Sequence, residues 1–131
     1  MFVDASALVA ILAQEPGYIP IGERLHAASS RSTSGLAVFE AVMAVARLKQ
    51  LTIAAAEAHV RDFLQAAAIA IVPIADAEAR EALAAFARFG KGQGHPAQLN
   101  MGDCFAYACA RTCKAELLFV GNDFSRTDIV P

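Results

Sequence analysis

The sequence predicts an α/β fold in which a mainly parallel sheet is covered by helices on both faces. Short apolar segments alternate along the chain with longer segments of helical periodicity, an alternation typical of parallel strands joined by helical crossovers. Right-handed crossovers then place the helices on the two faces. The hydrophobic fraction of 56% exceeds the ~45–50% usual for soluble domains. Such a surplus is expected when strands are buried on both faces or when a partner covers an apolar surface.

The first half of the chain is expected to contain two strands and four helices. Pro16 and Gly17 interrupt the first helical segment, and Thr52 is a suitable N-cap for the fourth. The second strand is weak because the stretch that holds it is polar. The expected elements are a strand at 1–4, helices at 5–13 and 19–28, a strand within 29–34, and helices at 35–49 and 52–67.

The second half begins with a β-branched segment that Pro73 closes, and Asp76 is the expected N-cap of the helix that follows it. Three glycines and Pro96 mark a loop at 90–99. The expected elements are a strand at 69–72, helices at 76–89 and 101–114, a strand at 117–120 and a last edge strand at 128–130. A chain of 131 residues with no internal repeat is expected to form one domain, residues 1–131.

Two acidic residues follow predicted strands. Asp4 ends the first strand, and Asp123 comes after the strand at 117–120 and a Gly-Asn turn. Ligands of open parallel sheets bind outside the carboxyl ends of the strands, so both carboxylates are placed where a ligand is expected. Each has an equally good local explanation: Asp4 as the N-cap of the next helix with the help of Ser6, and Asp123 as a turn residue.

Glu40 is the only charged residue in the apolar stretch 35–46, GLAVFEAVMAVA. A helix that is apolar nearly all round is typically buried, and an ionised carboxylate is rarely buried without a partner. The stretch also begins directly after the weak second strand, so Glu40 is expected near the same edge of the sheet. The alternative is an amphipathic helix with one exposed glutamate.

Asp103 opens the last long helix, in LNMGDCFAYA. With Asn100 as the N-cap, Asp103 is the third helical residue, where a carboxylate favours the helix dipole. Helix stability alone can therefore explain the presence of Asp103. It does not explain why four acids are expected at one edge of the sheet. Carboxylates that converge repel one another and hold protons unless a cation is present. Oxygen ligands favour Mg²⁺, or Mn²⁺, over zinc, and such an ion activates water and stabilises charge on a phosphate.

Several other classes of protein are disfavoured. The net charge is −2 and the pI about 5.9, which argues against non-specific binding to nucleic acid. The glycine-rich stretch GKGQGH follows a helix rather than a strand, so it is not a phosphate-binding loop of the usual kind. The stretch MFVDASALVAIL has no basic leader and is not expected to be a signal peptide. Three cysteines without disulfide-like spacing suit a reducing cytoplasm.

Four blocks of sequence together resemble the PIN-domain ribonucleases, in particular the VapC-type toxins of bacterial toxin–antitoxin pairs. The blocks are MFVDASALVAIL, LAVFEAVMAVARL, LNMGDCFAYACAR and LLFVGNDFSRTDI. With the chain length and the order of elements, the resemblance covers essentially the whole chain, although residues 51–98 match in layout more than in motif. Ala5 stands where a threonine is frequent in the family.

The resemblance implies a three-layer α/β/α sandwich, commonly dimeric, that hydrolyses RNA phosphodiester bonds with Mg²⁺ and is silenced by a small antitoxin protein. It implies that Asp4, Asp103 and Asp123 bind the metal and that these three and Glu40 are catalytic. Further positions by resemblance support the site: Ser6, Asn100 and Asp128.

The loop after the helix at 76–89 is a candidate for RNA contact. Arg88, Lys91 and His95 lie in or beside it, and basic groups position phosphates while glycines allow close approach of the backbone. His95 is also a candidate general acid. A solvated surface loop explains the same residues equally well.

Two other hypotheses about the function remain. A receiver-like signalling module is also α/β and holds Mg²⁺ in an acidic pocket, but it needs paired acids after the first strand, where this chain has Asp4 alone, and it leaves Glu40 unexplained. The second is an interaction module that keeps the fold without catalysis, which only an assay separates from the enzyme.

Overall fold

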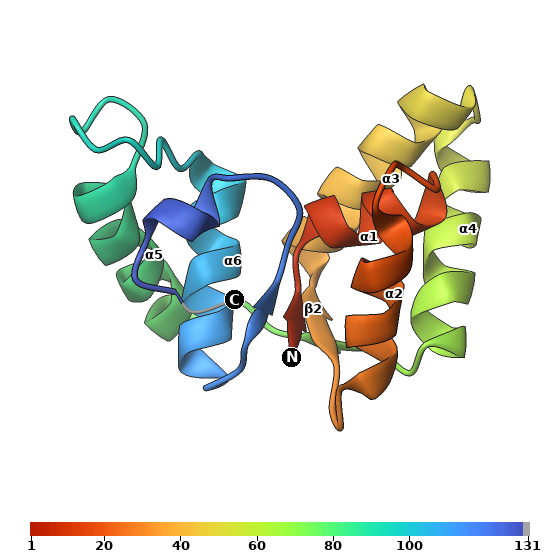
Figure 1. Ribbon diagram of the computed structural model, residues 1–131, viewed down its shortest axis with the longest axis horizontal. Helices are drawn as coiled ribbons and strands as arrows, with labels where there is room; N and C mark the ends of the chain where they lie inside the picture. The colour runs from red at the N-terminus through yellow and green to blue at the C-terminus, as the bar shows by residue number, and fades with distance from the viewer. Residues whose placement is uncertain (130–131) are drawn as a thin grey trace.

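The computed structural model describes residues 1–129 and is built around a four-stranded sheet in which all neighbouring strands are parallel (Figure 1). The strands are β1 (Phe2–Val3), β2 (Ser32–Ser34), β3 (Ala70–Val72) and β4 (Leu117–Leu118), in the order β3-β2-β1-β4. The chain moves outward from β1 to β2 and β3 and then returns to pair β4 with the other side of β1. The strand order therefore reverses at β1, and ligands of open α/β sheets bind where it reverses.

Helices cover both faces of the sheet and make two separate cores. Alternate residues of each strand point to opposite faces: Val3 and Leu118 pack among α1–α4, whereas Phe2 and Leu117 pack among α5 and α6. This arrangement confirms the predicted three-layer α/β/α sandwich. The helices are α1 (Ala5–Leu12), α2 (Tyr18–Ala27), α3 (Gly35–Lys49), α4 (Ile53–Ala66), α5 (Asp76–Phe89) and α6 (Met101–Thr112), and η1 (Phe124–Arg126) is a short 3-10 helix.

The order of strands and long helices agrees with the sequence prediction, but several local details differ, including the short helix η1, which was not predicted, and the strand β4, which ends at Leu118 rather than at residue 120. Asp76 is the first residue of α5 rather than its N-cap, and the Glu78 carboxylate instead accepts a hydrogen bond of 2.8 Å from the Ala75 N–H. Residues 128 and 129 are not in a strand, and residue 130, the end of the predicted edge strand, lies outside the described residues. None of the helices in residues 1–129 is both long and apolar enough to cross a membrane.

Helix α3 is buried along one side only. Ala41 and Val45 are fully buried, but Phe39 is 63% and Met43 48% exposed. The expectation that this apolar helix would be buried all round is therefore wrong within the single chain. An apolar sequence shows that a helix face avoids water, but it does not show whether the covering surface comes from the same chain.

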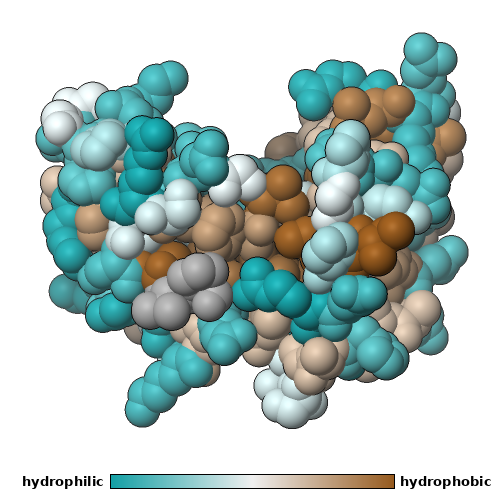
Figure 2. All heavy atoms as spheres, viewed as in Figure 1, coloured by the Kyte–Doolittle hydropathy of each residue, from teal (hydrophilic) through white to brown (hydrophobic). Residues whose placement is uncertain are grey.

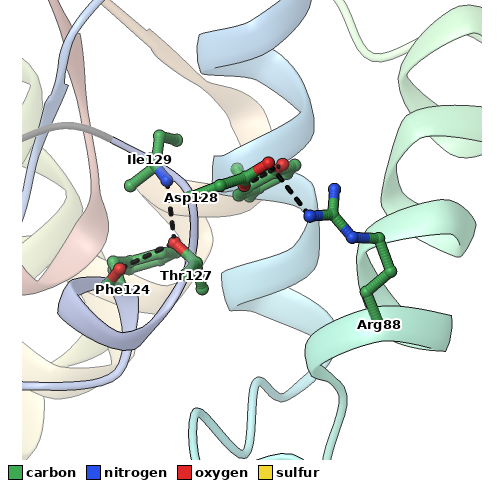
Figure 3. A network of polar contacts seen from close by, with 6 residues as sticks. Arg88, Phe124, Thr127, Asp128 and Ile129 are labelled. Atoms are coloured by element: carbon green, nitrogen blue, oxygen red, sulfur yellow. Dashed lines mark hydrogen bonds and ion pairs between the residues drawn. The ribbon is translucent and has the colours of Figure 1, made fainter.

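A network of polar contacts ties the C-terminal segment to α5 and α6 (Figure 3). Asp128 accepts a hydrogen bond of 2.6 Å from the Tyr107 hydroxyl on α6 and pairs with Arg88 on α5 at 3.1 Å. Thr127 donates to the Phe124 carbonyl at 2.7 Å and accepts from the Ile129 N–H at 3.2 Å. The network therefore holds the segment that follows η1.

We expect Tyr107→Phe to lower the free energy of unfolding by about 1 kcal/mol at pH 7. Hydrogen bonds to charged groups contribute about 1.5–3 kcal/mol, and the Asp128 side chain is 40% exposed, which weakens this one. The hydroxyl of Tyr107 is the main reason that the pKa of Asp128 lies below its ordinary 3.8. A lowered pKa in the folded state stabilises the fold above pH 3.8 and loses that effect as the pH falls through the folded-state value.

Denaturant unfolding at pH 7 and near pH 3 measures this contribution, and the difference between Tyr107→Phe and the original chain should shrink at the lower pH. The matched control is Tyr18→Phe, a change at the chain's other tyrosine, on α2. Equal stability of the Tyr107→Phe variant and the original chain at pH 7 would contradict the assigned contact.

Candidate active site

Beyond the carboxyl ends of β1 and β4 lies a pocket of about 390 Å³ between α1, α3 and the segment that follows β4. Its lining includes Ser6, Glu40 and Val120. Figure 2 shows a notch in the upper outline of the molecule, between the half that contains α1–α4 and the half that contains α5 and α6.

Asp4 follows β1 directly and is only 5% exposed. Its backbone N–H donates to the Leu118 carbonyl at 3.0 Å, which fixes it beside the end of β4. The carboxylate caps α1: Oδ2 accepts 3.0 Å from the Ser6 N–H and 2.5 Å from the Ser6 hydroxyl. Asp4 is therefore both the predicted N-cap of α1 and the residue that follows the end of β1. Burial raises the pKa of Asp4 in spite of these bonds, and Asp123 raises it further.

Ser6 connects two parts of the site. Its hydroxyl donates to Asp4 and accepts a hydrogen bond of 3.0 Å from the Val120 N–H. Val120 lies on the segment between β4 and Asp123, so one side chain links the two strand ends that carry acids. Gly121, the next residue, has a φ of +107°, which L-residues with a side chain rarely adopt. The turn that presents Asp123 therefore needs a glycine at this position.

Glu40 stands in the second turn of α3, which begins directly after β2. Ser34 caps this helix, since its hydroxyl accepts a hydrogen bond of 3.1 Å from the Ala37 N–H. The Glu40 carboxylate lies against Gly102 on α6, so it reaches from α3 toward the opposite helical layer. Burial, then Asp4, then Asp103 raise its pKa to about 7. Glu40 is thus half-buried, and its surroundings disfavour its ionised form.

Asp103 and Asn100 form the predicted capping box at the start of α6. The Asn100 side chain accepts 2.9 Å from the Asp103 N–H, and the Asp103 carboxylate accepts 3.0 Å from the Asn100 N–H. This second bond lowers the pKa of Asp103, but burial outweighs it, and together with Asp4 and Asp123 raises the pKa to about 6. Asp103 therefore stabilises the start of α6 through the capping box, whereas its ionised charge destabilises the fold.

The pKa shifts show that the predicted acids share one electrostatic environment. Asp4 and Asp103 both act on Glu40, and Asp123 acts on Asp4 and Asp103. Within residues 1–129, however, no group of three or more His, Cys, Asp or Glu side chains is arranged so that it could hold a metal ion. Of the four predicted acids, Glu40 lines the pocket at this edge of the sheet. Carboxylate oxygens are nevertheless the ligands that hard divalent cations prefer, and the charge of such a cation offsets the repulsion between the carboxylates.

The other predicted residues lie away from this environment. Asp128 is bound to Tyr107 and Arg88 and is not among the groups that raise the pKa of the acids. Arg88 also stacks over the Phe89 ring at 4.5 Å. His95 accepts a hydrogen bond of 3.1 Å from the Ala97 N–H and packs edge-on against Phe89, with 5.0 Å between the ring centroids.

Lys91 is exposed on the same loop. Of these positions, Arg88 and His95 already have partners within the chain, and their contact with RNA stays a prediction. Sequence reasoning missed the Val120 N–H, a backbone group that carries no sequence signal. It also missed Gly102, for which a signal existed, namely a glycine in the first turn of an otherwise favourable helix.

Known proteins match the chain over nearly its whole length. A model of the PIN domain family matches residues 1–130. A VapC ribonuclease of Rhizobium meliloti is 43% identical, over 98% of this chain and 98% of the relative. Ribonuclease VapC28 of Mycobacterium tuberculosis is 36% identical, over 98% of this chain and 95% of its own. Ribonuclease VapC42 of the same species is 35% identical, over 100% and 98%.

The fold of the chain and its similarity to these proteins support the same family. The parallel sheet between two helical layers is the architecture that the resemblance implied, and the matches extend through residues 51–98, where no motif was found. The predicted resemblance is confirmed: the chain belongs to the PIN-domain family.

Proposed function

We propose that this chain is a Mg²⁺-dependent endoribonuclease that hydrolyses RNA phosphodiester bonds and acts as the toxin of a toxin–antitoxin pair. One observation supports it most: Asp4, Glu40 and Asp103 all have raised pKa values at the carboxyl edge of a parallel sheet. Clusters of such perturbed groups are typical of functional sites. The named relatives are ribonucleases, which supplies the substrate class.

In this proposal Asp4, Asp103 and Asp123 hold Mg²⁺, for which Mn²⁺ can substitute because it accepts the same oxygen donors. An ion held by these residues would supply a water of lowered pKa and positive charge beside the phosphate and the leaving oxygen. Glu40 is the proposed general base, since a carboxylate with a pKa of about 7 is near the best value for proton transfer at neutral pH. Ser6 and Asn100 hold Asp4 and Asp103 in place through the bonds described above.

The alternatives are weaker. A receiver-like module is excluded because the chain belongs to the PIN-domain family. An interaction module without catalysis has no need of four acids whose mutual repulsion costs stability. We therefore keep the enzyme as the proposed function and assign to the antitoxin, a small protein partner, the role of silencing it in the cytoplasm.

RNA cleavage is expected to require a divalent cation and Asp4. Asp4→Asn keeps the shape of the side chain and the capping of α1, since asparagine is as good an N-cap as aspartate, but it removes the charge. Cleavage of a structured RNA should fall by orders of magnitude while the far-UV circular dichroism spectrum stays the same. Asp62→Asn, a change at an exposed acid on α4, is the matched control. Undiminished cleavage by the Asp4→Asn variant, or by the original chain in excess EDTA, would refute the proposal.

Asp103→Asn should stabilise the metal-free protein at neutral pH. The pKa of Asp103 is raised to about 6, so its ionised form costs stability above that pH, and the cost disappears as the pH falls toward 4. The Asn100 N–H can still donate to the asparagine oxygen, so the capping box is weakened rather than lost. If Asp103 were only a cap, its substitution would lower stability by ~0.3–1 kcal/mol instead.

The same two proteins test the metal. Mg²⁺ at a hundredfold excess over its Kd should stabilise the original chain by about 2.7 kcal/mol and raise its melting temperature by several degrees. The response of the Asp103→Asn variant should be much smaller. Melting curves with and without Mg²⁺, at pH 7.5 and pH 5, decide the matter, and equal responses of the two proteins would remove Asp103 from the metal site.

We also propose a homodimer. Besides Phe39 and Met43 on α3, an apolar cavity of about 410 Å³ lies between α5 and α6, and Leu83 and Met101 on its rim are 70% and 66% exposed. Exposed apolar surfaces of this kind typically mark interfaces. Light scattering at micromolar concentrations should give twice the mass of one chain. A single-chain mass up to the highest soluble concentration would contradict the dimer.

A further inference from the structure

Gly102 is the second residue of α6, and it is buried against the end of the Glu40 side chain. An ideally placed Cβ on Gly102 would overlap Oε2 of Glu40 and lie 2.7 Å from Oε1 and 2.8 Å from Cδ. The three atoms nearest to that Cβ all belong to Glu40. The space that a methyl group would fill is therefore the space that the carboxylate occupies.

The local backbone does not require glycine at this position. The φ of Gly102 lies outside the left-handed region, unlike that of Gly121, and other side chains are compatible with it. Alanine also favours a helix over glycine, because glycine loses more conformational freedom on folding. Helix stability thus predicts alanine at position 102, and the contact with Glu40 gives a physical reason for glycine.

We propose that Gly102 is a positioning residue for Glu40: the missing side chain leaves a space beside the first turn of α6 in which the Glu40 carboxylate is held facing Asp103. The inference rests on the proposed function, in which Glu40 accepts a proton. A methyl group at position 102 would displace the end of a flexible side chain and not a backbone segment. We therefore expect the fold to survive the substitution and the carboxylate to move.

Gly102→Ala should lower kcat for RNA cleavage on the order of 10²-fold, the loss that a shift of about 1 Å in a catalytic group can cause. KM should stay unchanged, because the surface that binds the substrate is intact. Adding Gly102→Ala to Glu40→Ala should cause little further loss, because Gly102 acts through Glu40. Gly22→Ala is the matched control: Gly22 is also a helical glycine, on α2, but its Cβ would have no atom within 4 Å, and its kcat should be that of the original chain.

A second measurement tests the contact without RNA. Melting temperatures of the metal-free protein form a double-mutant cycle from Gly102→Ala and Glu40→Ala. Gly102→Ala should raise the melting temperature more in the Glu40→Ala background, where the alanine has free space, than in the original chain, where it crowds the carboxylate. The same change in both backgrounds would overturn the contact.

The combined results separate the two hypotheses. Unequal melting shifts with undiminished kcat in the Gly102→Ala variant would overturn the positioning role. An equal loss of kcat on adding Gly102→Ala to either background would overturn it as well, because Gly102 would then act independently of Glu40. If the original chain cleaves no RNA, the proposed function fails and the positioning role fails with it, but the melting cycle still decides whether Gly102 and Glu40 are in contact.

Discussion

Asp4 loses nearly all of its water where β1 ends, and a buried carboxylate is stable in ionised form only where polar groups or a cation replace that water. The fold supplies polar groups that replace part of this water. Ser6 donates two hydrogen bonds to Asp4, and the N-terminus of α1 contributes the favourable end of a helix dipole. Ser6 in turn accepts from the Val120 N–H. The solvation of one carboxylate thus fixes the relation between β1, α1 and the segment that leads to Asp123.

The topology of the sheet explains why the other acids meet Asp4. The strand order reverses at β1, so β2 on one side leads into α3 with Glu40, and β4 on the other side leads to Asp123. Helix α6 brings Asp103 from the opposite layer. Asp4 is the N-cap of α1, and Asp103 completes the capping box at the start of α6, so each of these predicted site residues also stabilises a helix.

The sequence was sufficient for what depends on local signals and on the rule for parallel strands. The alternation of strands and helices predicted the layers, and the position of Asp4 after a strand predicted the edge of the sheet where it lies. Contacts between residues that are far apart in the chain could not be predicted from the sequence. Asp128 was assigned to the site, but its partner Arg88 is 40 residues away, and no pattern links the two. The exposure of Phe39 was missed because periodicity identifies an apolar face but not the chain that covers it.

The cost of the acids to stability and the chemical use proposed for Glu40 come from the same cause. Part of the water around Glu40 is removed, and two neighbouring carboxylates repel its charge, so its pKa rises to about 7. An ordinary exposed glutamate, with a pKa near 4.5, holds a proton too weakly at neutral pH to be an effective base. The buried environment that makes the ionised side chain costly also makes it able to take up a proton. Gly102 belongs to this balance, because it gives up helix stability to leave room for the carboxylate where the repulsion acts.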